Sequence, residues 1–251
     1  MTGLPPDYTI IARDSVGSTN DEAAALFAKG TSSRTVVTAK TQTKGRGRYG
    51  RNWTSEDGNL FASIILTPPG ETFQWGQIGF VISLAIAEAL QRFLPTNAKV
   101  QLKWPNDVLV NDKKIAGVLL EIKQNGQGKD GLILGFGVNC ASHPEGTDLP
   151  ATNLAAEGSE THAPEAVLEA VLVNFDRYYE LWKEKGFAAV RPGWLALAKD
   201  INKEITVRFA GKDIKGIFAD IGSDDGALYI KGADDAVERI SAGDVHFGTA
   251  T

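Results

Sequence analysis

The chain has 251 residues, 43% of them apolar and 23% charged, which is typical of a folded globular protein with one main core and a small second module. Its formal net charge of −5 argues against a protein that wraps nucleic acid, because such binding usually relies on a broad basic face. The single cysteine, Cys140, excludes an internal disulfide and favours a reducing compartment such as the cytoplasm.

Strand and helix patterns alternate along the first 140 residues. The run from Ser18 to Glu22 joins capping residues to early acids and predicts the start of a helix, which Gly30 is placed to end. Apolar residues with helical spacing from Ile78 to Phe93 predict a long second helix that stops at Pro95. The predicted strands cover residues 8–12, 35–40, 60–66, 100–104, 108–110, 115–122 and 131–139, and residues 108–122 form a hairpin.

A long amphipathic helix and a small β-module are predicted for the rest of the chain. Pro164 stands where a helix would start and Gly186 where it would end, and the apolar stripe between them must pack on a sheet. From about Glu204 the apolar residues alternate along short segments, and residues 224–226 predict a tight turn. We therefore divide the chain into a larger domain, residues 1–203, and a small all-β domain, residues 204–251.

Neither a targeting segment nor a zinc site is expected. Residues 1–7 lack the basic and apolar regions of a signal peptide, and no apolar run approaches the ~20 residues that span a bilayer. The three histidines, His143, His162 and His246, do not have the spacing of metal ligands. The sequence therefore predicts a cytoplasmic protein without a membrane partner.

The segment from Lys44 to Arg51, Lys-Gly-Arg-Gly-Arg-Tyr-Gly-Arg, holds four cations and three glycines and no acid; we call it the glycine/arginine loop. Glycines let backbone N–H groups approach a ligand closely, and arginine forks match the oxygens of phosphate or carboxylate in pairs. The loop therefore predicts a site for an anion. The alternative, a solvated turn without a ligand, is less favourable because neighbouring arginines repel one another.

Gly45, Gly47 and Gly50 also have the spacing of the dinucleotide fingerprint G-x-G-x-x-G. That fingerprint requires the last glycine to open a helix, and the residues from Arg51 to Asn59 have no helical period. A Gly-Lys-Ser/Thr run is also absent from the sequence, so a P-loop is not expected.

Polar residues at one strand end form a second motif, Lys103-Trp104-Pro105-Asn106-Asp107. Pro105 would hold the amide and carboxylate that follow it in a rigid corner, where they suit Mg²⁺ or a nucleotide hydroxyl, although a simple turn explains them equally well. Lys114 opens an apolar strand and is a candidate for a dry pocket, although a lysine at a strand edge is more often a solubility device.

The third motif is Gly135-Phe136-Gly137-Val138-Asn139, in a predicted strand. Glycine inside a strand often marks the close approach of a ligand or of another backbone, and the Asn139 amide can read a base or a peptide edge. Packing alone is the alternative. Cys140 is assigned to the core, because no histidine partner is near it in sequence.

In this order, the motifs closely resemble those of biotin protein ligases. The resemblance rests on Ser18-Thr19-Asn20, Gln42, the glycine/arginine loop with Trp53, Lys103 to Asp107, Lys114-Ile115-Ala116-Gly117, and Gly135 to Asn139. It covers almost the whole chain and implies an α+β fold, with a class II aminoacyl-tRNA synthetase-like catalytic domain over residues 1–203 and an SH3-like β-barrel over residues 204–251. Only seventeen residues precede Ser18, as in the short form without an N-terminal DNA-binding domain. Tyr49 stands where relatives often have arginine or histidine.

The resemblance implies a role for each motif. The groups that would bind biotin are hydroxyl, amide, N–H and apolar groups from Ser18, Thr19, Asn20, Gln42, Gly45, Arg46, Lys114 and Gly117, with Ile115, Ala116 and Leu119 completing an apolar wall. The catalytic residues would be the cations that surround the biotin carboxylate and the α-phosphate of ATP, namely Lys114, Arg48 and Arg46. The nucleotide-binding residues would be Arg48, Trp53, Asn106 and Asn139, and Asp107 would be the Mg²⁺ ligand.

The implied reaction has two steps. The biotin carboxylate attacks the α-phosphorus of ATP and releases pyrophosphate, and a lysine amine of a biotin carboxyl carrier domain then attacks the biotinyl-adenylate. Positioning and preorganised charge would catalyse both steps. We further expect residues 43–52 to close over the adenylate once its phosphate neutralises the arginines.

Two other functions stay open at this point. A lipoate ligase would share the architecture and the adenylation chemistry, and a nucleic-acid-binding module would use the basic loop without catalysis. The acidic net charge and the single occurrence of the loop disfavour nucleic acid, and DNA is not an expected partner. Both a monomer and a homodimer are compatible with the sequence.

Overall fold

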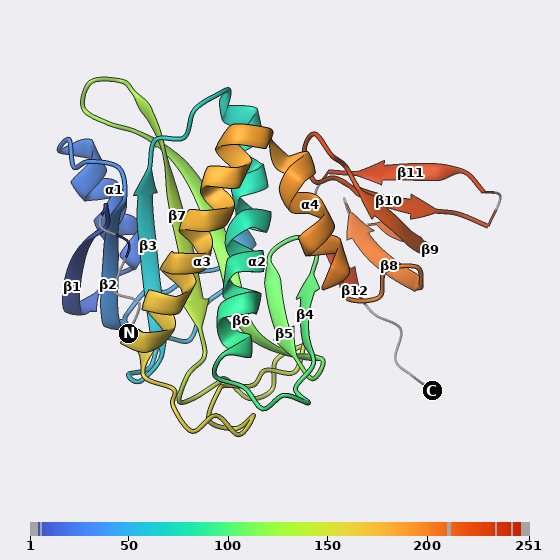
Figure 1. Ribbon diagram of the computed structural model, residues 1–251, viewed down its shortest axis with the longest axis horizontal. Coiled ribbons are helices and arrows are strands. Elements are labelled where there is room, and N and C mark those ends of the chain that lie inside the picture. The colour runs from blue at the N-terminus through green and yellow to red at the C-terminus, as the bar shows by residue number, and fades with distance from the viewer. Residues whose placement is uncertain (1–4, 6, 210–211, 234, 242, 247–251) are drawn as a thin grey trace.

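The computed structural model describes residues 5, 7–209, 212–233, 235–241 and 243–246 (Figure 1). The outer limits of both predicted domains therefore lie outside the described residues. So does most of residues 1–7, where no signal peptide is expected.

A seven-stranded mixed sheet forms the larger part of the molecule (Figure 1). Its order is β1-β2-β3-β7-β6-β5-β4; β1 and β2 are parallel, and all other neighbours are antiparallel. The strands are β1 (Thr9–Val16), β2 (Thr35–Gln42), β3 (Leu60–Leu66), β4 (Val100–Lys103), β5 (Asp107–Val110), β6 (Lys113–Gln124) and β7 (Asp130–Val138). All seven predicted strands of this region are confirmed within a few residues at their ends.

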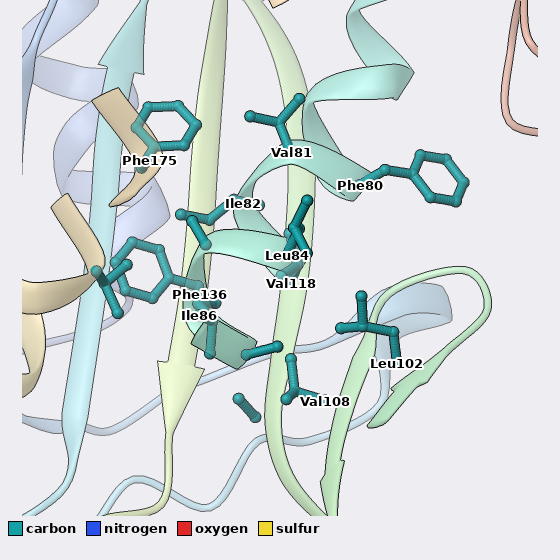
Figure 2. Packing of buried hydrophobic residues seen from close by; sticks show 14 of the residues in the cluster. Phe80, Val81, Ile82, Leu84, Ile86, Leu102, Val108, Val118, Phe136 and Phe175 are labelled. Carbon is teal, nitrogen blue, oxygen red and sulfur yellow. The ribbon is translucent and has the colours of Figure 1, made fainter. Parts of the chain in front are cut away.

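Helices cover the two faces of this sheet unequally. Helix α2 (Ile78–Gln91), preceded by the 3₁₀ segment η2 (Thr72–Gln77), and helix α3 (Pro164–Lys185) lie over one face (Figure 1), where they share the main core with residues such as Val36 and Ile64. Figure 2 shows Ile82 of α2 in this core, near Phe136 of the sheet. Helix α1 (Thr19–Ala28) packs through Phe27 on the other face against the alternate residues Val37 and Ile65. The period of two along a strand explains this division. Since α1 has only 10 residues, helix covers only a small part of this second face of the sheet.

The stretch Thr72–Gln91 is long and apolar enough to cross a membrane, but 78% of its 18-residue window is buried inside the protein. Ile82 and Ile86 in this stretch have no exposed surface, and each such side chain contributes about 2 kcal/mol through burial. The apolar character of this stretch is therefore that of a core helix.

One helix was not predicted. Helix α4 (Phe187–Ala196) follows α3 after Gly186 and buries Val190 and Trp194, although it contains Pro192. Proline removes an intrahelical hydrogen bond and normally ends a helix. Here the packing of the large aromatic residues on α2 outweighs that local cost.

The small C-terminal domain is an antiparallel sheet that starts at Glu204 (Figure 1). Its order is β11-β10-β9-β8-β12, with β8 (Glu204–Phe209), β9 (Lys212–Ile221), β10 (Leu228–Lys231), β11 (Val237–Ile240) and β12 (Asp244–His246). The predicted all-β module is confirmed. Over the described part of the chain, however, no ladder joins β11 to β12, so the five strands form an open sheet and not the closed barrel that was expected.

Candidate active site

Three glycines form a flat floor on the α1 side of the sheet. They are Gly117 on β6 and Gly135 and Gly137 on β7. A Cβ at Gly117 or Gly137 would lie 2.9 or 2.7 Å from the indole of Trp53, and one at Gly135 would overlap the Asn20 amide. The glycines of the third motif thus allow two predicted site residues to lie directly on the sheet.

The polar residues at the start of α1 meet Gln42 beside this floor. Ser18, Thr19 and Asn20 are all about 4% exposed. The Gln42 Oε1 atom accepts a hydrogen bond from the Thr19 backbone N–H at 2.8 Å and lies 3.1 Å from the Thr19 hydroxyl oxygen, while Gln42 Nε2 donates to Ser55 Oγ at 2.9 Å. The structure therefore brings together four of the residues predicted to bind biotin.

The glycine/arginine loop folds back on itself, and its only helical part among the described residues is the short 3₁₀ segment η1 (Arg48–Gly50). Arg46 and Asn52 form an antiparallel bridge, and the Trp53 N–H donates to the Gly45 carbonyl at 3.0 Å. A Cβ at Gly45 would lie 2.5 Å from the Trp53 carbonyl oxygen, so this position requires glycine. Residues 51–59 contain no helix, which agrees with the rejection of a dinucleotide fold.

The two central arginines of the loop have different partners. The Arg46 guanidinium forms a bidentate pair with Asp21 at 2.7 and 2.8 Å and also contacts Glu121 at 3.0 Å. The hydrogen bond with Asp21, opposed by partial burial, raises the pKa of Arg46, and the same bond lowers the pKa of Asp21. Arg46 is therefore already neutralised by two carboxylates.

Arg48 has uncharged partners instead. It donates to Asn106 Oδ1 at 3.4 Å and to Tyr49 Oη at 3.0 Å, and its guanidinium lies 4.9 Å from the Tyr49 ring centroid. Tyr49 itself has a left-handed backbone (φ 56°) and a side chain that is largely exposed. Among the described residues, no carboxylate lies within ion-pair distance of Arg48, so its charge is available to an incoming anion.

Lys114 lies at the edge of the glycine floor. Its Nζ is 2.7 Å from Asp107 Oδ1 and 5.4 Å from the Trp53 ring centroid, and its side chain is 27% exposed. Hydrogen bonds on both sides hold its backbone, because Lys114 N–H donates to the Pro150 carbonyl and the Thr152 N–H donates to the Lys114 carbonyl. Lys114 is thus a fixed cation in a partly dry position.

The surroundings of Asp107 do not suit a resident metal ion. Its carboxylate lies 2.7 Å from the Lys114 ammonium and 3.9 Å from that of Lys103. The described residues also contain no group of three or more histidine, cysteine or acidic side chains that could hold a metal. Two ammonium groups compete with a dication, so the predicted Asp107 site for Mg²⁺ finds no support in the arrangement of charges.

Asn139 holds the loop that follows β7 through hydrogen bonds. It is 3% exposed, donates from Nδ2 to the Thr152 carbonyl at 2.9 Å, and accepts the Leu154 N–H through its backbone carbonyl. One hydrogen of its amide nitrogen is thus bonded within the protein. The predicted contact with adenine would use the second hydrogen or the amide oxygen. Burial raises the pKa of the neighbouring Cys140 thiol to about 12, which fits its assignment to the core.

Several residues of this site were missed in the sequence. Ser63, Ser55, Glu121 and Asp21 link the predicted residues to one another, and Asn59 accepts three backbone N–H groups from residues 140–142 through its Oδ1 atom. The hydroxyl of Ser63 in an otherwise apolar strand was the one available signal.

A cleft of about 240 Å³ opens between the seven-stranded sheet and the C-terminal sheet. Arg48 and Asn106 line it on one side, and Asp225 and Gly226 line it on the other. Arg48 is therefore accessible from this cleft.

Comparison with known proteins identifies the family to which the chain belongs. Residues 13–139 match the biotin/lipoate A/B protein ligase family, and residues 200–248 match the biotin protein ligase C terminal domain. The chain belongs to the biotin/lipoate A/B protein ligase family.

Individual relatives narrow the class to the biotin protein ligases. The chain is 37% identical to a biotin–[acetyl-CoA-carboxylase] ligase of Paracoccus denitrificans over 92% of this chain and 97% of that one. It superposes on the Aquifex aeolicus biotin protein ligase in complex with biotin and ATP with a TM-score of 0.80, at 29% identity and over 95% and 97% of the two chains. The Leishmania major enzyme in complex with biotinyl-5-AMP gives a TM-score of 0.67 at 27% identity, over 95% of this chain and 100% of that one. The predicted fold class, a synthetase-like catalytic domain with a C-terminal β-domain, is confirmed.

Proposed function

We propose that this chain is an ATP-dependent ligase that forms biotinyl-5′-AMP from biotin and ATP and then transfers biotin to a lysine of a biotin carboxyl carrier domain. The observation that carries the proposal is that a neutral polar cluster, Thr19, Asn20 and Gln42, and the cation Lys114 lie at one glycine floor. Arg48 is linked to the same part of β6 through Asn106, which bonds to Val118.

The polar cluster suits the uncharged head of biotin. A urea ring needs donors for its carbonyl oxygen and acceptors for its two N–H groups, and the hydroxyl and amide groups of the cluster provide both kinds. Trp53 lies directly over Gly117 and Gly137, and Asn20 lies over Gly135, so the flat bicycle would lie beside these two side chains. The apolar side chains of Ile115 and Ala116, which are fully buried in the core beneath, hold the backbone of the glycine floor in place.

The cations suit the reacting end. Lys114 and Arg48 would draw the biotin carboxylate and the α-phosphate together and would stabilise the charge that develops on the phosphorus oxygens. No protein nucleophile is required, which agrees with the raised pKa of the buried Cys140 thiol. Arg46 would act mainly through its backbone and by fixing the loop, because its side chain is already paired with Asp21 and Glu121.

Magnesium enters this proposal only as part of the substrate Mg-ATP. Asn106 and Arg48 lie where the phosphates would pass toward the cleft between the two sheets. The partner in the proposed reaction is a carrier domain of a biotin-dependent carboxylase, and the predicted cytoplasmic location would supply the ATP that the reaction consumes.

The test is incubation of the purified chain with labelled biotin, Mg-ATP and an isolated carrier domain, with lipoate in a parallel reaction. We expect biotin-dependent release of pyrophosphate and label on one lysine of the carrier. Release that depends on lipoate and not on biotin would overturn the choice of substrate, and absence of adenylate with either acid would overturn the ligase function.

A further inference from the structure

A continuous chain of hydrogen bonds runs beneath the proposed site and joins residues that are far apart in sequence. It starts at Glu121 on β6, which accepts a hydrogen bond from Asn20 Nδ2 at 2.7 Å. It continues through Ser63 on β3, whose hydroxyl lies 2.6 Å from Asn20 Oδ1 and 2.8 Å from Thr19 Oγ1. The single Ser63 hydrogen is directed to Asn20 Oδ1, so the Thr19 hydroxyl donates to Ser63, and Thr19 reaches Gln42 through its backbone N–H.

The charge of Glu121 gives this chain a direction. An ionised carboxylate can only accept hydrogen bonds, so the NH₂ end of the Asn20 amide must face Glu121 and the carbonyl end must face Ser63. Burial alone would raise the pKa of Glu121, but the hydrogen bond from Asn20 and the charges of Arg46 and Lys123 together lower it. Glu121 is therefore ionised at neutral pH, and the Asn20 amide has one orientation.

The far end of the chain is fixed in the same way. The Thr19 backbone N–H can only donate, so the oxygen end of the Gln42 amide must face it. The NH₂ end then faces Ser55, whose hydroxyl donates to the Trp53 carbonyl at 2.9 Å. Each amide nitrogen carries two hydrogens, and these contacts use one on Asn20 and one on Gln42.

We propose that Glu121 and Ser63 are positioning residues, which fix the Asn20 amide and, through Thr19, support that of Gln42, so that the cluster presents N–H donors to the carbonyl oxygen of a urea ring. This inference rests on the proposed function. It assigns to Glu121 and Ser63, which carry no role in the reaction above, the orientation of the groups that select biotin.

Burial makes these contacts effective. Ser63 has no exposed surface, and Asn20 is 4% exposed, so water cannot easily replace a lost partner. A glutamine at position 121 keeps the shape of the side chain but offers both a donor and an acceptor, so Asn20 could turn over. An alanine at position 63 removes the only hydroxyl that contacts Asn20 Oδ1 in the described structure.

The test is isothermal titration of biotin into the parent chain, Glu121→Gln and Ser63→Ala. The matched control is Glu88→Gln, because Glu88 is also a half-buried carboxylate with hydrogen-bonded partners, Arg177 and Tyr178, but on α2, remote from the site. We expect the Kd for biotin to rise at least tenfold in both test variants and to stay within twofold in the control. The KM for ATP should change less than threefold in all of them.

A double-mutant cycle separates this role from a general effect on the loop, since Glu121 also contacts Arg46. In an Asn20→Ala background, Glu121→Gln should raise the Kd for biotin less than threefold further. A full tenfold additional loss would show that Glu121 acts through Arg46 and would overturn the inference, as would parent-like affinity in the single variants. If the parent itself binds no biotin, the proposed function fails first and the inference fails with it.

Discussion

Lys114 is the cation whose removal gives the most informative prediction. Lys114→Met keeps much of the aliphatic stem over the glycine floor but removes the ammonium that lies 2.7 Å from Asp107 and 5.4 Å from the Trp53 ring. Loss of one preorganised charge at the reacting phosphorus costs about 3 kcal/mol in the transition state, so we expect adenylation to slow about a hundredfold.

The same change has a separate effect on stability. The side chains of Lys114 and Asp107 are 27% and 11% exposed, so the pair lies between a surface ion pair, worth up to about 1 kcal/mol, and a buried one, whose breakage costs about 3–5 kcal/mol. We expect a loss of roughly 2 kcal/mol and a fall in Tm of about 4–8 °C. In Lys114→Met/Asp107→Asn no carboxylate is left unpaired, so much of the stability should return while the rate stays low.

The assays are biotin-dependent pyrophosphate release and calorimetric melting. Lys113→Met is the matched control, because Lys113 is the preceding residue on β6, is 51% exposed, and lies 3.5 Å from Glu157. Its rate should stay within threefold of the parent. If Lys114→Met kept more than a third of the parent rate, the ammonium would have no part in charge stabilisation and the reasoning would be refuted.

Three other changes test the loop, the floor and the acids. Arg48→Gly should release a reactive adenylate that labels bystander lysines, and retention of the adenylate for as long as in the parent would contradict closure of the loop. Gly137→Val should weaken biotin binding at least tenfold in titration, because its Cβ would lie 2.7 Å from the Trp53 indole; unchanged affinity would show that the floor can yield. The pKa values of Asp21 and Glu121 are lowered in the folded chain, so their stabilising effect should be fully present above their unfolded values of about 4 and should fade as the pH falls through the lower folded values. Urea unfolding of the parent and of Asp21→Asn at pH 3 and pH 7 checks this, and an equal difference between the two proteins at both pH values would count against it.

Elements with strong local patterns could be predicted from the sequence, and elements set by tertiary contacts could not. Strand Leu60–Leu66 and helix Pro164–Lys185 have clear apolar patterns with proline or glycine signals, and their predicted and observed limits agree almost to the residue. Helix α4 contains Pro192, and β11 is four residues long with three exposed side chains, so neither has a readable period.

The site divides in a similar way. Residues whose chemistry is unusual for their position, such as Arg48 and Lys114, could be chosen by residue type and motif. Their partners could not, because the contacts cross the sheet: Glu121 is 101 residues from Asn20, and Ser63 is 43 residues from it. Only the register of β3, β7 and β6 brings these side chains together.

The turn at Gly226 of the C-terminal sheet packs against the catalytic domain. The Trp104 indole donates to the Gly226 carbonyl at 2.9 Å, and a Cβ at Gly226 would collide with the Phe80 ring. Trp104 stands two residues before Asn106, which accepts a hydrogen bond from Arg48. A shift of the small domain would therefore also displace the partner of Arg48. The C-terminal sheet thus supports the position of Arg48. A chain shortened at residue 203 should therefore lose the formation of biotinyl-5′-AMP as well as the transfer of biotin to the carrier domain.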